Sequence, residues 1–275
     1  MTDPRRALDA IGQLPDAEID IGEAALQLAK VDVPGTDWSS AEQHLSLLAR
    51  DAVAMAASFD GADLQERADA LAGLLAGTFG YRGDTDTYDD LANANLIRVI
   101  ERRRGLPVAL GILWIHTARC AGWDCHGVDF PAHFLIALTD GRKQVAVDVF
   151  NGGQVMAAGD LRALLRRVEG PGAELRPGLL QPMNTRRVLL RLQNNIMTRR
   201  LQAGDIEGGL TCTEDMLRFA PDQAELWRQS GALNQKLHRV SAAAASYRKF
   251  LELVPQGAVA DAVRAQLDIL KTMLN

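Results

Sequence analysis

Apolar residues run almost without interruption through residues 107–120 (PVALGILWIHTARC), and this run is the strongest pattern in the chain. Pro107 stands in the first turn of the expected helix, where the N–H that proline lacks would have no helical partner. A surface helix shows a polar face, and the stretch from Val108 to Ile115 has none. We therefore predict a buried central helix that begins after Gly105 and ends at Gly122.

Three short segments rich in β-branched and aromatic residues follow this helix: CHGVDF (125–130), HFLIAL (133–138) and QVAVDVF (144–150). Such segments are typical of strands. Asp140-Gly141 lies between the second and third segments, and this pair favours a tight hairpin turn. The sequence therefore predicts a small antiparallel sheet backed by the buried helix, which is an α+β arrangement.

Apolar positions at helical spacing predict three helices before this region, over about 19–33, 41–57 and 64–75. In the second of these, we expect Leu45, Leu48, Ala49, Val53 and Met55 to face the core. A polar, glycine-containing break at residues 79–95 leads into a further helix, LIRVIERRRG.

The last third of the chain shows a recurrence of 34 residues: Pro221 and Pro255, Met216 and Phe250, Leu217 and Leu251. Trp227, Gly231, Ala244 and Tyr247 occupy the positions typical of a helix-turn-helix repeat. The pattern resembles tetratricopeptide repeats, followed by a terminal helix over residues 259–274. A Gly/Pro-rich stretch at 170–182 marks the expected boundary between a first domain (1–180, core about 93–165) and a repeat domain (185–275).

The composition is that of an ordinary globular protein, with 47% apolar and 24% charged residues and a net charge of −5. Residues 1–99 carry 18 acidic and 7 basic side chains, whereas residues 100–275 carry 17 and 23. The acidic total argues against nucleic acid as the main partner. The three cysteines form no disulfide framework and no metal-type pair, so we expect a reducing compartment and no metal or cofactor. Because no apolar run could serve as a signal peptide or membrane span, we expect a cytoplasmic protein that does not enter a membrane.

Several motifs together resemble one known group. RRRGLP, FPAHFL and VDVFNGG, with YDDLANANLIRVIERRRG upstream, are similar to the bacterial SirB-type proteins, which join a transglutaminase-like core to tetratricopeptide repeats. The resemblance implies a core related in shape to papain-type proteases.

The resemblance also implies a catalytic constellation. Active transglutaminase-like enzymes have a Cys at the start of the central helix, a His that accepts its proton and an Asp that orients the His. The motifs match the His to His133 and the Asp to Asp148, which we expect to be adjacent and near the start of the helix. The nucleophile would fall within Pro107 to Ala109, where no residue has a thiol or a hydroxyl.

Another thiol could replace the missing one. Cys120 lies at the C-terminal end of the helix, where the helix dipole opposes a thiolate. Cys125 lies on the following strand and could face either way. If its sulfur reached His133, an enzyme would be favoured; a buried Cys125 behind the sheet would close that route.

Other candidate residues have a structural and a functional interpretation. The His133–Asp148 pair could be a purely structural hydrogen bond or part of a binding site, and His116 and His126 are weaker candidates. The arginines Arg102, Arg103 and Arg104 could form a solvated helix end or bind an anion or an acidic partner. Trp227 and Tyr247 could line a groove for a peptide, or the repeats could only cover the core.

Two functions are therefore compatible with the sequence. The first is a non-catalytic interaction or regulatory protein that binds a protein or peptide. The second is an amide hydrolase or acyltransferase that uses His133 and Asp148 with an unrecognised nucleophile or an activated water. The absence of a nucleophile at residues 107–109 favours the first.

Overall fold

The computed structural model describes residues 3–274, with side chains through Thr272. Residues 15–192 form one compact unit, which we call the core unit. The described residues on either side, 3–14 and 193–274, form a second, which we call the repeat unit. Each is described by itself.

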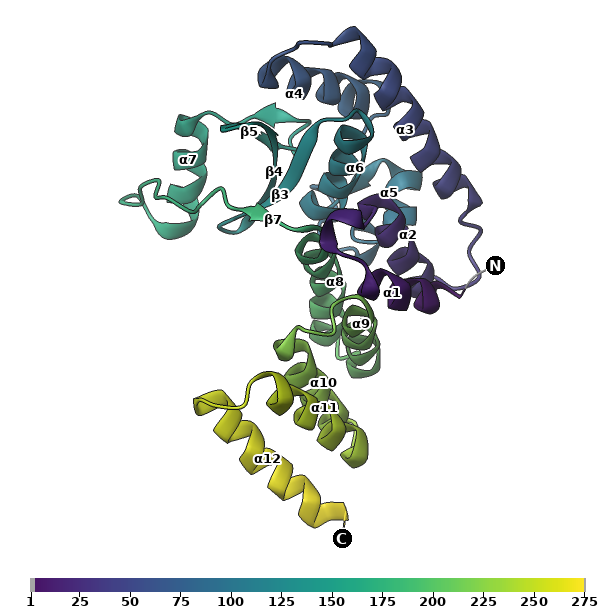
Figure 1. The fold of residues 1–275 in the computed structure, drawn as a ribbon, viewed down its shortest axis with the longest axis vertical. Coiled ribbons are helices and arrows are strands. Elements are labelled where there is room, and N and C mark those ends of the chain that lie inside the picture. Colours follow the sequence, from purple (N-terminus) through teal and green to yellow (C-terminus); the bar gives the residue numbers. More distant parts are fainter. Residues whose placement is uncertain (1–2, 275) are drawn as a thin grey trace. The chain divides into compact units, whose positions relative to one another are not determined.

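The core unit contains helices, one π-helical segment and a small sheet (Figure 1). Its longer helices are α2 (Ile21–Asp32), α3 (Ser39–Ser58), α4 (Leu64–Ala72), α5 (Leu96–Arg102), α6 (Pro107–Cys120) and α7 (Ala158–Glu169). Three short helical segments complete them: η1 (Asp16–Glu18), η2 (Gly73–Thr78, a π-helix) and η3 (Leu91–Asn93). The strands are β1 (Arg82–Gly83), β2 (Arg104–Gly105), β3 (Asp124–Phe130), β4 (His133–Asp140), β5 (Lys143–Asp148), β6 (Gln154–Val155) and β7 (Pro182–Met183).

The predicted central helix is confirmed. It starts with Pro107 as its first residue, ends at Cys120 and is buried at every position from 107 to 118. Such burial on all sides is what a helix without a polar face requires. The predicted strands are also confirmed, because β3, β4 and β5 pair in antiparallel order within the sheet β6-β5-β4-β3-β7. Asp140 pairs with Lys143, so Asp140-Gly141 lies in the tight turn, as predicted.

The two faces of this sheet pack against different helices, with α6 on one side and α7 on the other (Figure 1). On the α6 side, the ring of Phe134 lies so close to Gly111 of α6 that a Cβ there would come within 2.3 Å of it. The same ring would lie 2.9 Å from a Cβ at Gly127 of β3. On the α7 side, an apolar cluster joins the sheet to that helix; it contains Val128, Phe130, Leu135, Ala137, Ala146, Leu161, Leu164 and Leu165.

The predicted inner face of α3 is partly wrong. Leu45 and Leu48 are buried, but Val53 is 59% exposed and Ala52 takes its place in the core. Positions 41, 45, 48 and 52 follow one stripe of a helix with 3.6 residues per turn, and residue 53 lies outside it.

The chain divides differently from the sequence prediction. The boundary lies between residues 192 and 193, and residues 3–14 belong to the repeat unit. The Gly/Pro stretch stays with the core unit because its leucines, among them Leu175 and Leu180, pack against the α7 cluster. At its end, β7 adds a strand beside β3.

The repeat unit consists of α1 (Pro4–Gln13), part of α8 (Thr185–Gln202), α9 (Ile206–Phe219), α10 (Ala224–Lys236), α11 (Val240–Leu253) and α12 (Ala258–Leu274). The predicted helical repeats are therefore present. One apolar cluster joins α11 and α12; it includes Tyr247, Phe250, Val263, Leu267 and Leu270. Helix α1 packs on α9, where Arg5 pairs with Asp215 at 2.9 Å. Over residues 3–274, no helix is both long enough and apolar enough to cross a membrane.

The close approach of α6 to the sheet can be tested by replacing Gly111 with Ala. A Cβ would press on the Phe134 ring, so we expect a loss of about 1–3 kcal/mol in the free energy of unfolding. This loss should appear although alanine is intrinsically the better helix former, by roughly 1 kcal/mol. Urea unfolding would measure it as a lower transition midpoint with an unchanged slope.

Gly159→Ala in α7 is the matched control, since no atom lies within 4 Å of a Cβ at that helical glycine. Its midpoint should stay the same or rise slightly. Equal midpoints for both variants would show that the contact between Gly111 and Phe134 does not set how closely α6 packs on the sheet.

Candidate functional site

The two residues predicted to be adjacent do meet. Ile136 of β4 lies opposite Val147 of β5, so the start of β4 lies beside the end of β5. Nε2 of His133 lies 3.2 Å from Oδ2 of Asp148. The carboxyl of Asp148 is buried, whereas the imidazole keeps 17% of its surface exposed. The pair thus has one end inside the fold and one end open to solvent.

Asp148 is held by more than the histidine. The side-chain amide of Asn151 donates to its Oδ2 at 2.8 Å, and the backbone N–H groups of Phe150 and Asn151 donate to its Oδ1 at 3.1 and 3.3 Å. Burial alone would raise the pKa of this carboxyl, but the hydrogen bonds from His133 and Asn151 outweigh it, and the pKa is lowered from its usual value. Asp148 is therefore an anion with a fixed orientation.

This arrangement determines what the imidazole can do. Nε2 of His133 donates to the carboxylate, so the neutral ring presents the lone pair of Nδ1. Within residues 3–274, Nδ1 has no hydrogen-bond partner. It can accept a proton from water or a hydrogen bond from a ligand.

The NGG motif closes the loop behind this pair. The backbone N–H of Gly153 donates to the carbonyl oxygen of Asp148 at 2.9 Å. Gly153 has a φ of 90°, and a Cβ on it would lie 2.2 Å from the Trp114 ring of α6. Only glycine satisfies both conditions.

The same loop is tied to the segment that precedes α6. The backbone N–H of Gly83 donates to the carbonyl oxygen of Phe150 at 3.0 Å, and Gly83 pairs with Gly105, two residues before Pro107. Hydrogen bonds therefore connect the loop that follows Asp148, through Gly83, to the residues just before α6. The distance from the imidazole to that helix end stays a prediction.

The position at which the resemblance predicts a nucleophile is closed and offers no nucleophilic group. Pro107, Val108 and Ala109 are all buried, and none has a group that could attack a carbonyl.

Cys125 does not replace the missing nucleophile. Side chains alternate between the two faces along a strand, so Cys125 shares a face with Gly127, which lies against Phe134 on the α6 side. His133 is opposite Phe130, which belongs to the cluster on the α7 side. The thiol and the imidazole therefore point to opposite faces of the sheet. Burial also raises the pKa of the Cys125 thiol to about 12.

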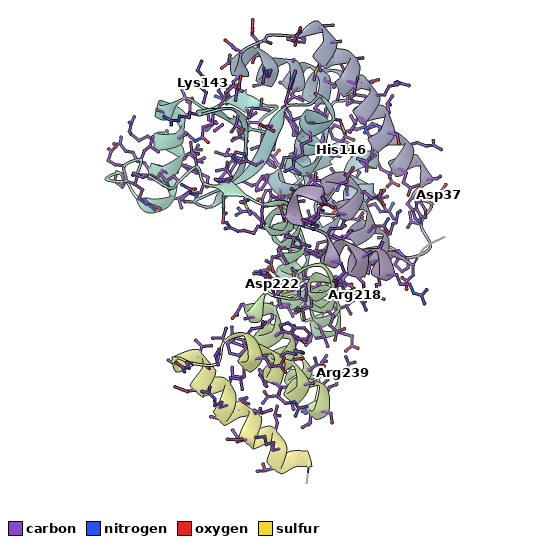
Figure 2. All side chains as sticks on the ribbon, viewed as in Figure 1. Asp37, His116, Lys143, Arg218, Asp222 and Arg239 are labelled. Carbon is purple, nitrogen blue, oxygen red and sulfur yellow. The ribbon has the colours of Figure 1, made fainter. Side chains whose placement is uncertain are left out.

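Cys120 and His116 lie together at the C-terminal end of α6 (Figure 2 labels His116). Sγ of Cys120 is 3.9 Å from Nε2 of His116, whose Nδ1 is 3.5 Å from Asp20. Burial and the negative charge of Asp20 raise the pKa of the Cys120 thiol, and Nε2 also lies 3.3 Å from the carbonyl oxygen of Leu45. This group therefore favours a protonated thiol. The imidazole of His126 is half-buried, and burial lowers its pKa.

The three arginines proposed as an anion site bind three different groups of the same protein. Arg102 donates to Asp84 at 2.8 Å and to Asn93 at 3.0 Å. Arg103 contacts the ring of His44 and the hydroxyl of Tyr81. Arg104 donates to Asp86 at 2.9 Å. These contacts hold the loop before α5 in place, so the three guanidinium groups already have partners within the core unit.

Arg191 of α8 is a neighbour of the site that the sequence analysis missed. Its guanidinium donates to the carbonyl oxygen of His133 at 3.2 Å, pairs with Asp129 and lies 5.7 Å from the centre of the Phe134 ring. It thereby holds the first residue of β4 from the side of α8. Sequence offered no signal for it, because it lies 58 residues beyond His133.

In the repeat unit, Trp227 and Tyr247 lie in different surroundings. Nε1 of Trp227 donates to the carbonyl oxygen of Pro221 at 2.8 Å, and its side chain is partly exposed. Tyr247 is buried, and its hydroxyl donates to Gln235 at 3.2 Å. Trp227 thus borders a surface, whereas Tyr247 belongs to the helix packing. Nowhere in residues 3–274 do three or more His, Cys, Asp or Glu side chains gather as metal ligands would.

Comparison with known proteins agrees with this geometry. The family model described as the transglutaminase-like superfamily matches residues 39–194, and a tetratricopeptide-repeat model matches residues 197–268. The chain is thus a transglutaminase-like protein over most of its core unit, followed by tetratricopeptide repeats. By its domain order and its relatives, the chain belongs to the SirB-type family of such proteins, and it is also similar to UPF0162 proteins.

Three relatives illustrate the match. A UPF0162 protein of Xylella fastidiosa (strain Temecula1) is 32% identical over 68% of this chain and 68% of its own. One of Vibrio cholerae is 29% identical over 92% of this chain and 93% of its own. Protein SirB1 of Salmonella typhimurium is 22% identical over 89% of each chain. The similarity to the Vibrio cholerae and Salmonella typhimurium proteins therefore extends over most of the chain.

The anionic state of Asp148 predicts a pH-dependent effect for Asp148→Asn. Because the folded pKa is depressed, the carboxylate stabilises the fold above the unfolded pKa of about 3.9, and this contribution is lost as the pH falls through the folded pKa. We expect the variant to be less stable than the natural protein by about 1–3 kcal/mol near neutral pH, with the gap closing below about pH 4. Urea unfolding between pH 7 and pH 3 measures it.

The exposed Asp60, replaced in the same way, should show little difference at any of these pH values. A gap for Asp148→Asn that is as large at pH 3 as at pH 7 would mean that the charge of Asp148 does not stabilise the fold.

Proposed function

We propose that this protein is a non-catalytic member of its family, in which the transglutaminase-like core and the repeats act as a protein-interaction or regulatory module. The observation that carries the proposal is the start of α6. Covalent acyl transfer needs a nucleophile beside the histidine, and Pro107, Val108 and Ala109 offer neither a thiol nor a hydroxyl.

The geometry around the cysteines supports the same conclusion. Cys125 lies on the other face of the sheet from His133, and burial raises its pKa far above neutrality. Cys120 lies at the opposite end of α6, where the helix dipole disfavours a thiolate. Neither thiol can take the place of the missing one.

One observation supports an alternative function. Nδ1 of His133 has no partner among the described residues, and Asp148 orients the ring. A histidine oriented in this way can act as a general base on water, which would give an amide hydrolase without a covalent intermediate. We rank this second, because the structural contacts of Asp148 explain the pair without catalysis.

The repeats favour interaction as the function. Stacked helix pairs present long surfaces whose shape follows from the repetition itself, and such surfaces commonly bind other proteins. The repeat unit has such surfaces. If the core catalyses no reaction, binding a partner protein is the function that the chain's two units would share.

The first test is an activity assay on the purified protein. We expect no thiol-dependent transfer of glutamine acyl groups to amines, and no hydrolysis of glutamine-containing peptides above the level of a His133→Ala variant. Turnover by the natural protein that His133→Ala abolishes would favour the hydrolase, and loss with Cys125→Ser would favour a covalent mechanism through that thiol.

The second test asks whether the rest of the constellation survives. Ala109→Cys puts a thiol in the first turn of α6, where the helix dipole favours a thiolate. The family resemblance predicts the imidazole of His133 beside it, and such surroundings lower a thiol pKa to roughly 3.5–7.5 in reactive sites. We expect this thiol to ionise at a lower pH than one placed by Ala118→Cys, which is equally buried at the other end of the helix. Because both positions are closed to an alkylating reagent, the ultraviolet absorbance of the thiolate, followed as the pH is raised, would measure both pKa values.

The difference should shrink when His133→Ala is added to Ala109→Cys, because only the contribution of the helix dipole would remain. A thiol at position 109 that ionises at the same pH with and without His133 would rule out an inherited catalytic geometry at the helix start.

A further inference from the structure

A groove of about 590 Å³ opens in the repeat unit. Helix α1 supplies one wall with Asp9 and Gln13, and α9 and α10 supply others with Leu217 and Trp227. The wall from α1 lies outside the repeats in sequence. It is fixed by ion pairs, because Arg218 of α9 donates to both oxygens of Asp9 at 2.9 and 3.0 Å (Figure 2 labels Arg218).

The polar side chains that line the groove leave one acceptor without a donor from the protein, the amide oxygen of Asn234. The hydroxyls of Ser230 and Ser246 lie 3.0 Å apart, and the side-chain amide nitrogen of Asn234 donates to the carbonyl oxygen of Ser230 at 3.0 Å. That carbonyl can only accept, so the orientation of the Asn234 amide is fixed. Its Oδ1 receives no hydrogen bond from residues 3–274, although the side chain is only 3% exposed.

Oδ1 of Asn234 opens onto the groove rather than being sealed inside the fold. It can therefore accept from solvent in the free protein and from a bound segment in a complex. Asn234 lines the groove, so a donor from outside can reach it there. The main-chain N–H of an extended peptide is a donor of the right kind.

The shape of the floor suits a peptide main chain. Ala242 and Ala245 of α11 line the groove and are exposed. Their side chains end at Cβ, so a second backbone can approach the helix closely. The ring of Trp227 is held at the side by its hydrogen bond to Pro221.

The charges of the groove favour a cationic side chain. Arg218 is neutralised by Asp9 and lies 3.5 Å from Asp215. Glu214 also lines the groove, and it forms no hydrogen bond or ion pair within residues 3–274. Burial and the neighbouring Asp215 raise the pKa of Glu214 by more than the charges of Arg239, Arg218 and Arg5 lower it. A further cation at this carboxylate would offset the remaining cost of its burial.

We propose that this groove binds an extended segment of a partner protein, with a Lys or Arg side chain of the segment at Glu214 and one of its main-chain N–H groups at Oδ1 of Asn234. The inference rests on the proposed interaction function and adds the kind of partner and the residues that recognise it.

The test starts from random eight-residue peptides displayed for binding to the full chain. Selected peptides are synthesised with a fluorophore, and their affinity is measured by fluorescence polarisation. We expect the selected peptides to be enriched in Lys or Arg and to bind more weakly as salt increases. Replacing the basic residue of the peptide with norleucine should weaken binding about fivefold or more.

On the protein side, Glu214→Gln should cause a similar loss. Glu252→Gln is the matched control, because this exposed carboxylate lies on α11 and pairs with Lys249 outside the groove. It should leave the affinity unchanged. Methylating each main-chain nitrogen of the peptide in turn tests the contact with Asn234 without altering the protein, and one position should lose binding.

The outcomes separate the two proposals. Failure to select any peptide, selection of acidic or neutral peptides, or equal effects of Glu214→Gln and Glu252→Gln would overturn the groove. Peptides that bind but ignore Glu214→Gln and main-chain methylation would leave the interaction function standing with its site elsewhere. Amide turnover through His133 would overturn the non-catalytic function and leave the groove intact.

Discussion

The ring of Phe134, seated between Gly111 of α6 and Gly127 of β3, sets how near the central helix comes to the sheet. Because neither glycine has a side chain, helix and strand close on the ring from both sides. Phe134 is the second residue of β4, and the alternation of the strand turns His133 to the other face. The position of the imidazole therefore follows from how an aromatic ring is packed. A change that moved this ring would move the histidine with it.

The contacts of Asp148 show how a His–Asp pair can serve the fold independently of catalysis. Its carboxylate accepts hydrogen bonds from His133, from the side chain of Asn151 and from two backbone N–H groups, and its carbonyl oxygen accepts one from Gly153. Most of these contacts close the turn between β5 and β6. None of these contacts involves a nucleophile, so the pair stabilises the turn with or without catalysis. The presence of His133 and Asp148 is thus a weak argument for an enzyme, and the residues at the helix start decide more.

The sequence predicted the parts of the fold that short-range patterns determine. The apolar run marked α6, Asp140-Gly141 marked the hairpin, and the family motifs placed His133 beside Asp148. Other features depend on contacts between distant residues, which no local pattern reports. Arg191 reaches His133 across 58 residues, and β7 joins the sheet after a stretch that looked like a linker. The sequence could not show on which face of the sheet Cys125 lies. Side chains of β3 alternate between the two faces, and only the packing of the sheet shows which face meets α6.

The place of α1 has a consequence for synthesis on the ribosome. Arg5 pairs with Asp215, 210 residues later, so the first helix leaves the ribosome long before its partner exists. At about 5–20 residues per second, the delay is roughly 10–40 seconds. The core unit, complete at residue 192, can fold during that interval, while α1 waits with Leu8 uncovered. This order of synthesis favours folding of the core unit first, and α1, although made before the core unit, can take its place only after α9 has been made.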